Sequence, residues 1–159
     1  MQRPLRMPAL PPIAQRLLHR YWRFSRGVTL GVRAAVLDGN RVFLVRHTYV
    51  AGWHLPGGGV EPGETALDAL TRELREEAAI ELGGAARLHG VYLNCNASDR
   101  DHVLLYVVRA FRVLSAKAPD REIAEAGFFP LDALPDGITA ATAARLDEIA
   151  EERPPAAVW

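Results

Sequence analysis

Residues 52–80 read GWHLPGGGVEPGETALDALTRELREEAAI, and this stretch decides both the fold class and the function expected of the chain. Its first part holds five glycines and two prolines between positions 52 and 63, which interrupts any helix or strand pattern. Its second part consists of helix-forming residues, and Thr65 and Asp68 have the spacing of a capping box at its start. We therefore predict a loop that leads into a helix from Thr65 to about Glu81.

The segments on either side of this loop and helix have the composition of strands. Residues 28–37 and 41–46 are rich in β-branched and aliphatic side chains, and the Asp38-Gly39-Asn40 sequence between them is typical of a hairpin turn. Beyond the central helix we expect strands at 88–94, at 102–113 and at Phe128-Phe129, and then a last helix over 140–151 capped by Thr139. This order predicts a mixed α/β layer fold in one domain.

Composition and charge place the chain among ordinary globular proteins. It has 159 residues, of which 49% are hydrophobic and 24% are charged, with 19 basic and 19 acidic side chains. We expect a domain over 27–153, an irregular basic lead-in with a short helix over 1–26, and a tail over 154–159. The basic character comes from arginines that precede the first acidic residue, Asp38: Arg3, Arg6, Arg16, Arg20, Arg23, Arg26 and Arg33. We favour a solvated arm over a surface for nucleic acid, acidic lipid or polyphosphate.

The cysteine content and the opening residues bear on the compartment. The lone Cys95 cannot form an internal disulfide, so a reducing cytoplasm is the expected location. The opening MQRPLRMPALPPIAQRLL is interrupted by arginines and prolines, which does not fit a signal peptide, and no uncharged run is long enough to span a bilayer. We therefore expect a cytoplasmic protein without a membrane partner.

The central helix carries a cluster of acidic side chains. Three glutamates fall within an arc of roughly 100° on this helix: Glu73, Glu76 and Glu77. Three leucines occupy the adjoining arc, so the acidic cluster borders the predicted buried stripe: Leu67, Leu70 and Leu74. Like charges at this spacing repel, and desolvation makes the repulsion worse unless a cation is present. Oxygen ligands suit Mg²⁺ or Mn²⁺ with a phosphate-bearing ligand, although the helix alone leaves a solvated acidic face open.

The preceding loop, LPGGGVEPGE at 55–64, favours the metal and phosphate interpretation. Its glycines allow close approach of backbone amides to an anion, next to a helix N-terminus that attracts negative charge. Joined to the helix, it reads Gly58, five residues, Glu64, seven residues and then RELREE from Arg72. This pattern resembles the 23-residue box of the Nudix hydrolase family, which here runs from Gly58 to Ile80. Ala79 departs from it, because the family usually has glycine there, and a left-handed backbone costs alanine roughly 1 kcal/mol.

The resemblance implies a Nudix-type α/β/α sandwich with a mixed curved sheet. It also implies hydrolysis of a phosphoanhydride (pyrophosphate) bond in a nucleoside diphosphate linked to another moiety, by attack of water at phosphorus. Glu73, Glu76 and Glu77 would bind Mg²⁺ or Mn²⁺, Arg72 would orient Glu73, and Glu64 would support the site more weakly. The general base stays open between Glu73 and a carboxylate from a later loop. Glu122 resembles that carboxylate slightly better than Glu125, and a solvated-loop role is the alternative for both.

Substrate contacts and partners are less constrained by the sequence. The candidates for substrate binding are Gly57, Gly58, Gly59, Arg46 and His54, with surface exposure as the alternative for Arg46. Downstream markers of the subfamilies are absent, so the substrate is described only as a small nucleotide-type molecule, and a homodimer is left open. A nucleotide-sensing module without turnover is the main alternative, but the intact set of acidic residues beside Arg72 argues against it. Balanced charge and the lack of a recognised motif argue against a nucleic-acid partner.

Overall fold

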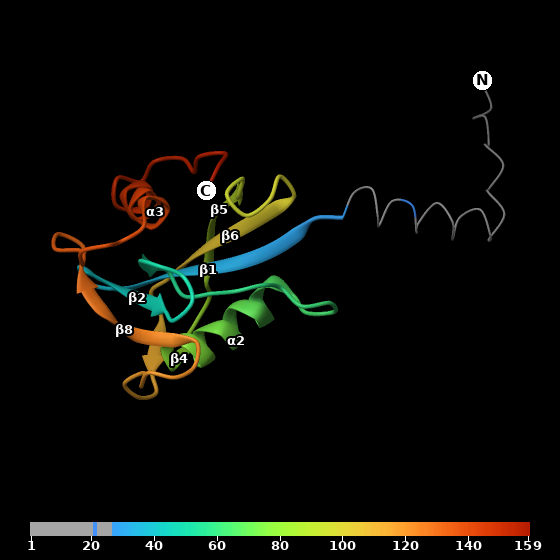
Figure 1. The fold of residues 1–159 in the computed structure, drawn as a ribbon. Coiled ribbons are helices and arrows are strands. Elements are labelled where there is room, and N and C mark those ends of the chain that lie inside the picture. The colour runs from blue at the N-terminus through green and yellow to red at the C-terminus, as the bar shows by residue number, and fades with distance from the viewer. Residues whose placement is uncertain (1–20, 22–26) are drawn as a thin grey trace, which may run out of the picture.

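The computed structural model of the chain describes residue 21 and residues 27–159 (Figure 1). The predicted basic lead-in and its short helix therefore lie outside the described residues, apart from Tyr21. Along the described range the elements follow one another as β1 (Thr29–Asp38), β2 (Arg41–His47), β3 (Trp53–His54), α2 (Ala66–Ala78), β4 (Ile80–Leu82), β5 (Arg87–Leu93), β6 (Asp101–Val108), β7 (Phe111–Val113), β8 (Ile123–Pro130) and α3 (Ala140–Ala150).

The main sheet is mixed and forks between β1 and β2. Strand β1 runs parallel to β6, β5 is antiparallel to β6, and β2 is antiparallel to β8 and β3. The hairpin predicted around Gly39 is present, but β1 and β2 pair only beside that turn, at Leu37 with Val42 and at Asp38 with Arg41. The sheet therefore consists of a β1–β6–β5 part and a β2–β8–β3 part that diverge from the hairpin. A separate two-stranded sheet pairs β4 with β7.

The glycine loop occupies the fork. The amide of Val32 donates to the carbonyl of Gly58 at 2.8 Å, and the amide of Ala34 donates to the carbonyl of Pro56 at 2.9 Å. The amide of Val60 donates in return to the carbonyl of Leu30 at 2.8 Å. These bonds use the edge of β1 that β2 has left, so the backbone of β1 holds the loop in place.

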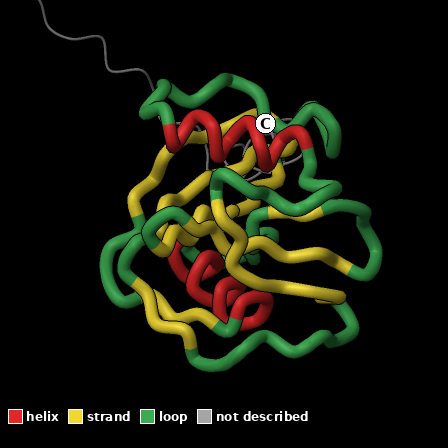
Figure 2. Tube along the Cα trace, turned by 90° about the vertical axis from the view of Figure 1, so that its left-hand side faces the viewer, coloured by secondary structure: helices red, strands yellow, loops and turns green. Residues whose placement is uncertain are grey.

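The two described helices cover opposite faces of the sheet (Figures 1 and 2). Successive side chains of β1 point to opposite faces of the sheet, so this strand contributes buried residues to both faces. Val32, Ala34 and Val36 pack in one cluster with Leu70 and Leu74 of α2. Ala35 and Leu37 pack in a second cluster with Leu146 and Ile149 of α3. The predicted α/β/α sandwich with a mixed sheet is confirmed.

The start of α2 is as predicted, but its end is earlier. The side chain of Thr65 accepts from the amide of Asp68, and the side chain of Asp68 accepts from the amide of Thr65, which completes the capping box. The helix ends at Ala78 because Ala79 takes the left-handed conformation with φ 52° and ψ 40°. The predicted extension to Glu81 is therefore wrong, since Ile80–Leu82 forms β4 against β7.

Three other predicted elements need correction. The single strand expected over 102–113 is divided into β6 and β7, because the chain turns at Arg109-Ala110 so that β7 can pair with β4. The short strand expected at Phe128-Phe129 is the longer β8, which places Glu125 in a strand. The glycine-rich stretch, expected to lack regular structure, includes the two-residue strand β3.

The last residues of the chain pack against β5. The amide of Leu93 donates to the carbonyl of Ala157, and the amide of Trp159 donates to the carbonyl of Leu93, both at 3.0 Å. Arg145 of α3 donates from Nη1 to the carbonyl of Val158 at 2.8 Å. Residues 157–159 are thus bonded to the domain that precedes them. No helix in the described part of the chain is long and apolar enough to cross a membrane.

Candidate active site

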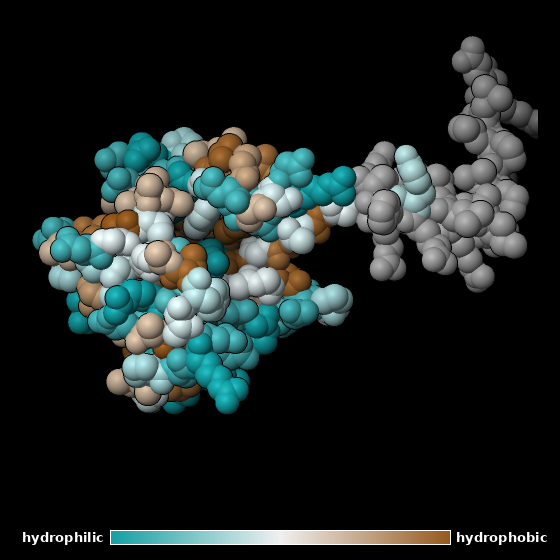
Figure 3. Space-filling view, viewed as in Figure 1, coloured by the Kyte–Doolittle hydropathy of each residue, from teal (hydrophilic) through white to brown (hydrophobic). Residues whose placement is uncertain are grey.

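The acidic face of α2 is partly buried. Glu73 is 9% exposed and Glu77 is 6% exposed, whereas the side chain of Glu76 is 61% exposed. Leu67, predicted in the buried stripe, is 49% exposed, so that part of the helical pattern was misassigned. The helix turns two carboxylates toward the sheet in addition to Leu70 and Leu74. Figure 3 shows hydrophilic side chains gathered over α2 and a hollow in the surface above this helix.

Two glycines of the loop leave no space for a side chain. A Cβ atom built on Gly58 would lie 2.7 Å from Cδ of Glu73, within the volume of its carboxylate. Gly57 has φ of 141°, and a Cβ atom there would lie 2.9 Å from the carbonyl carbon of Val32. These glycines therefore permit the loop to contact β1 on one side and the carboxylate of Glu73 on the other.

Arg72 connects the helix to the loop. Its Nη1 donates to Oε1 of Glu73 at 2.6 Å, and its Nη2 donates to the carbonyl of Gly59 at 3.0 Å. Its Nε and Nη2 also bind both oxygens of Glu64, at 3.0 and 3.1 Å. The hydrogen bonds that Arg72 donates to Glu64 and Glu73 raise the pKa of its guanidinium, and the bond from Arg72 lowers the pKa of Glu64. Arg72 thus contacts Glu73, as the resemblance implied, and also Glu64 and Gly59.

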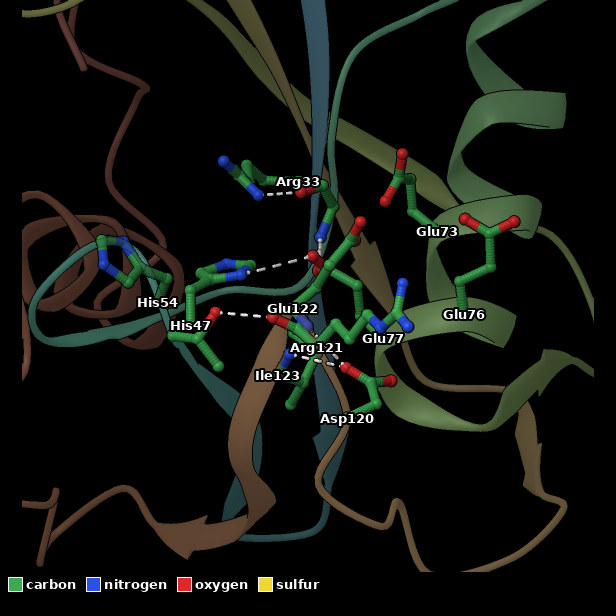
Figure 4. Close-up of polar contacts among 12 residues, drawn as sticks. Arg33, His47, His54, Glu73, Glu76, Glu77, Asp120, Arg121, Glu122 and Ile123 are labelled. Atoms are coloured by element: carbon green, nitrogen blue, oxygen red, sulfur yellow. Dashed lines mark hydrogen bonds and ion pairs between the residues drawn. The ribbon is translucent and has the colours of Figure 1, made fainter.

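Glu77 contacts the loop and a buried histidine. The amide of Gly57 donates to its Oε2 at 2.8 Å, and Nδ1 of His47 lies 3.7 Å from its Oε1 (Figure 4). Burial raises the pKa of Glu77 to about 7, although the Gly57 amide and the charge of Arg33 act in the opposite direction. Burial also lowers the pKa of His47 to about 4, assisted by Arg33 and His54. Two buried ionisable groups therefore lie near each other, and burial shifts their pKa values in opposite directions.

The donor set fits a divalent cation. A carboxylate can accept about four hydrogen bonds, yet that of Glu77 accepts a single one from the described residues. Burying such a group without full partners raises its pKa, and a hard cation would offset that penalty. In the described residues no three His, Cys, Asp or Glu side chains are already grouped around one point. Glu73 is turned toward Arg72 and Glu77 toward Gly57, so joint coordination requires these side chains and Glu76 to reorient.

The loop before β8 brings further acidic side chains to the site. Glu122 donates its amide to Oδ1 of Asp120 at 2.8 Å and accepts at its carbonyl from the amide of Thr48 at 2.9 Å. Its negative charge helps to raise the pKa of Glu77, which indicates proximity of the two carboxylates, as Figure 4 shows. Glu125 lies in β8 and forms an ion pair with Arg46 at 2.6 Å. The two glutamates that the sequence left in competition are therefore separated.

Arg46 and His54 were predicted to contact substrate. Arg46 is engaged by Glu125 and lies over the ring of Trp53, with its guanidinium carbon 5.5 Å from the ring centroid. Nε2 of His54 lies 3.0 Å from the carbonyl of Ala51, and its ring centroid is 5.7 Å from that of His47. His54 is thus a neighbour of His47, Arg46 is held by Glu125 and Trp53, and neither side chain forms a bond to the acidic cluster.

Sequence reasoning missed two residues of the site. Arg33, in β1, donates to the carbonyl of Gly57 and acts electrostatically on Glu77 and His47. The available signal was a single arginine within the otherwise apolar run 30–37. His47 gives no such signal in the sequence, because its contact with Glu77 depends on how β2 lies against α2. Beside it, a hollow of about 560 Å³ is lined by His47 and by Tyr49, which is 72% exposed.

Comparisons with known proteins identify the class. The NUDIX domain family model matches residues 27–150. The chain therefore belongs to the Nudix family, as its central box predicted. This membership supports the expectation of an enzyme that acts on acid anhydrides.

Individual relatives and structures agree with this assignment. The ADP-ribose pyrophosphatase of Methanocaldococcus jannaschii is 32% identical over 128 residues, which cover 77% of this chain and 73% of the relative. A putative 8-oxo-dGTP diphosphatase of Bacillus subtilis is 37% identical over 76 residues, so the match spans 47% of this chain and half of that relative's length. The crystal structure of a MutT NUDIX hydrolase from Burkholderia pseudomallei aligns with a TM-score of 0.63 at 28% identity, over 76% of this chain and 97% of that one.

Proposed function

We propose that this chain uses Mg²⁺ or Mn²⁺ to hydrolyse a phosphoanhydride (pyrophosphate) bond in a nucleoside diphosphate linked to another moiety. The observation that carries the proposal is the pair of buried carboxylates, Glu73 and Glu77, packed on the glycine loop with fewer partners than their charge requires. Two relatives, named for ADP-ribose and 8-oxo-dGTP, support a nucleotide-type substrate. The single cysteine, Cys95, supports a reducing cytoplasm as its location.

Three glutamates of α2 would hold the cation: Glu73, Glu76 and Glu77. When bound, a divalent cation neutralises charge on the pyrophosphate oxygens and makes water a better nucleophile. Arg72 positions Glu73 through its bond of 2.6 Å and anchors the helix to the loop at Gly59. The loop amides that are not bonded to β1 supply donors for phosphate oxygens.

We assign the role of general base to Glu122 in preference to Glu73. The carboxylate of Glu73 is engaged by Arg72, whereas that of Glu122 accepts no hydrogen bond from the described residues. Glu122 is exposed at the edge of the site, in a loop whose backbone is fixed to Thr48. It can therefore take a proton from the attacking water and release it to solvent.

The hollow beside His47 is the proposed place for the nucleoside. Tyr49 is exposed at its wall and its ring centroid lies 5.1 Å from that of His47, so a base could stack on the tyrosine. Arg46 also lines this hollow and would have to leave Glu125 to reach a phosphate. His54 stays in the proposal as a neighbour of His47 and not as a phosphate ligand.

A nucleotide panel tests the reaction class and the substrate together. We would incubate the full chain with ADP-ribose, 8-oxo-dGTP, ADP and ATP, in Mg²⁺, in Mn²⁺ and in excess chelator, and separate the products by chromatography. We expect at least one compound to be cleaved at a pyrophosphate bond, with activity lost in chelator and restored by added metal. Full activity in chelator, or tight binding of the nucleotides with no cleavage under any condition, would contradict the proposal.

A further inference from the structure

A β-bulge in β5 places His89 in the wall of a second hollow. Leu88 pairs with Tyr106 and Gly90 pairs with Leu105, so His89 is the extra residue of the strand. Bulges of this kind redirect a side chain and are common beside functional sites. The His89 side chain is only 7% exposed, and its Nε2 has no hydrogen-bond partner among the described residues. The hollow measures about 560 Å³ and lies on the α3 side of the sheet, opposite α2.

The hollow is rich in positive charge. Arg87, Arg109 and Arg153 line it together with His89, and Glu152 is the acidic member of the wall. Arg153 is paired with Glu151, at 2.6 Å between Nε and Oε2. Arg87 and Arg109 are exposed and form no ion pair within the part of the chain that the structure describes. Two guanidinium groups are therefore left uncompensated at the mouth of the hollow.

The floor and one wall of the hollow are tightly built. Glu148, beneath His89, accepts from Nη2 of Arg145 at 2.7 Å, from the Tyr92 hydroxyl at 3.0 Å and from the amide of Ala156 at 3.2 Å. Nε2 of His89 lies 3.8 Å from Oε2 of Glu148, which is too long for a hydrogen bond. Glu148 is therefore already satisfied by other groups, and Nε2 of His89 is left without a hydrogen bond among the described residues.

Gly90 completes this construction. A Cβ atom on Gly90 would lie 3.0 Å from Cγ of Pro155, closer than the proline could tolerate without moving. The glycine thus allows Pro155 to close the wall of the hollow beside His89. The bulge, the glycine and the buried network below give the hollow a fixed shape, unlike a chance depression between surface side chains.

We propose that this hollow is a second anion site, which binds a small phosphate-bearing molecule between Arg87, Arg109 and His89. The planar guanidinium groups of arginine match phosphate oxygens in a bidentate geometry. A volume of about 560 Å³ lies in the range of small-molecule sites. The site is independent of the proposed hydrolysis, because its residues lie on the opposite side of the sheet from the acidic cluster.

Imidazole NMR of the full chain tests this proposal without any enzymatic assay. Inorganic phosphate, pyrophosphate and ADP would be titrated separately at constant ionic strength in chelator, which removes divalent cations from the acidic cluster. We expect the His89 resonances to shift and saturate while those of His102, near the start of β6 and outside both hollows, stay in place. If phosphate and pyrophosphate saturate the shift and ADP binds no more tightly than they do, the ligand of the site is a free anion. If ADP binds more tightly, the ligand is the phosphate group of a nucleotide.

Variants separate a built site from general attraction of anions. The double variant Arg87→Gln/Arg109→Gln should weaken binding of the best probe at least tenfold, and both positions are exposed, so the fold should survive. Arg100→Gln removes one exposed positive charge next to the other end of β6, where the double variant removes two, and it should leave the affinity unchanged. His89 resonances that ignore all three probes would overturn the proposal. Equal weakening by Arg100→Gln and by the double variant would overturn it as well.

Discussion

The helices α2 and α3 both bury a glutamate against the sheet, but they treat its charge differently. Glu148 of α3 is 3% exposed and has three donors, including the guanidinium of Arg145 at 2.7 Å. Glu77 of α2 is 6% exposed and has one backbone donor, from Gly57, plus a histidine at 3.7 Å. The pKa of Glu77 is raised to about 7 in consequence, because burial of its charge is not compensated.

This difference distinguishes a structural acid from a functional one. A buried carboxylate whose lone pairs are filled by the protein holds the fold together and has no capacity for a ligand. A buried carboxylate with open lone pairs destabilises the empty protein and gains from a cation. On this reasoning we infer that α3 is a structural helix, and we propose that α2 carries the reaction. Each of the following predictions tests one side of that contrast.

The largest effect is expected from neutralising the acids of α2. Glu76→Gln and Glu77→Gln should each lower turnover by at least about a hundredfold, because each removes a proposed cation ligand and its contribution to charge neutralisation. The stability of the metal-free protein should stay equal or rise, since like-charge repulsion falls. Turnover assays and thermal melts in chelator measure the two quantities. A large loss of metal-free stability would instead favour a structural role for these residues.

The next effect concerns the proposed base. Glu122→Gln should lower turnover by roughly a hundredfold with little change in substrate binding, as expected for loss of a general base. Glu125→Gln is the matched control, because it removes the same charge three residues away but from the ion pair with Arg46. Steady-state kinetics from pH 6 to 9 compare the two variants. Parent-like turnover in both would move the role of base to Glu73.

A stability effect without a catalytic one is expected on α3. Glu148→Gln should lower the free energy of unfolding by about 3 kcal/mol, because it leaves the guanidinium of Arg145 buried without its counter-charge. Turnover of the folded protein should change less than twofold. Denaturant unfolding and kinetics on the same preparation test this, and a loss of turnover as large as that of Glu77→Gln would remove the distinction between the helices.

The pH dependence of stability should reveal the pair of Glu77 and His47. The folded-state pKa of Glu77, about 7, lies above its ordinary value of 4.5, so its contribution to stability falls as pH rises through that interval. The folded-state pKa of His47, about 4, lies below its ordinary value of 6.5, so its contribution rises over that interval. In the parent the two trends oppose each other.

Single variants separate these trends. In metal-free buffer, His47→Gln should become less stable from pH 4.5 to 7, and Glu77→Gln should become more stable from pH 4 to 6.5. Each change should be on the order of 1 to 3 kcal/mol relative to the parent. Urea unfolding at several pH values measures both. Slopes of the same sign in the two variants would contradict the opposed pKa shifts of Glu77 and His47.

The smallest effect is expected where the helix ends. Ala79→Gly should stabilise the protein by about 1 kcal/mol, because glycine adopts the observed φ of 52° without the steric penalty of a Cβ atom. Metal binding should be unchanged, since the residue contributes no oxygen ligand from its side chain. Ala78→Gly is the control one residue earlier, inside the helix, and should destabilise by about 1 kcal/mol or more. Thermal melts of both variants show whether each substitution raises or lowers the stability.

Local signals in the sequence predicted the elements that local contacts determine. The capping box of Thr65 and Asp68 and the hairpin turn at Gly39 each lie within a few residues, and both are present. The end of α2 could not be predicted in this way. It depends on the pairing of Ile80 with Val113, which lies far along the chain, and that pairing also divides the strand expected over 102–113.

The same limit applies to the site. The spacing of the three glutamates on α2 was readable from the helical period, but their unequal burial was not, because it depends on the fork between β1 and β2. Arg33 and His47 approach Glu77 only after the glycine loop is bonded along β1. The separation of Glu122 from Glu125 follows from the register of β8 against β2, which pairs Arg46 with Glu125.

Binding of Mn²⁺ measured by calorimetry tests most directly whether open carboxylates of α2 form the cation site. The parent and Glu148→Gln would be compared with Glu77→Gln at the same pH, each after a melt that confirms folding. We predict saturable binding in the parent, similar affinity in Glu148→Gln and at least a tenfold loss in Glu77→Gln. Absence of binding in the parent, or equal affinity in Glu77→Gln, would contradict the account.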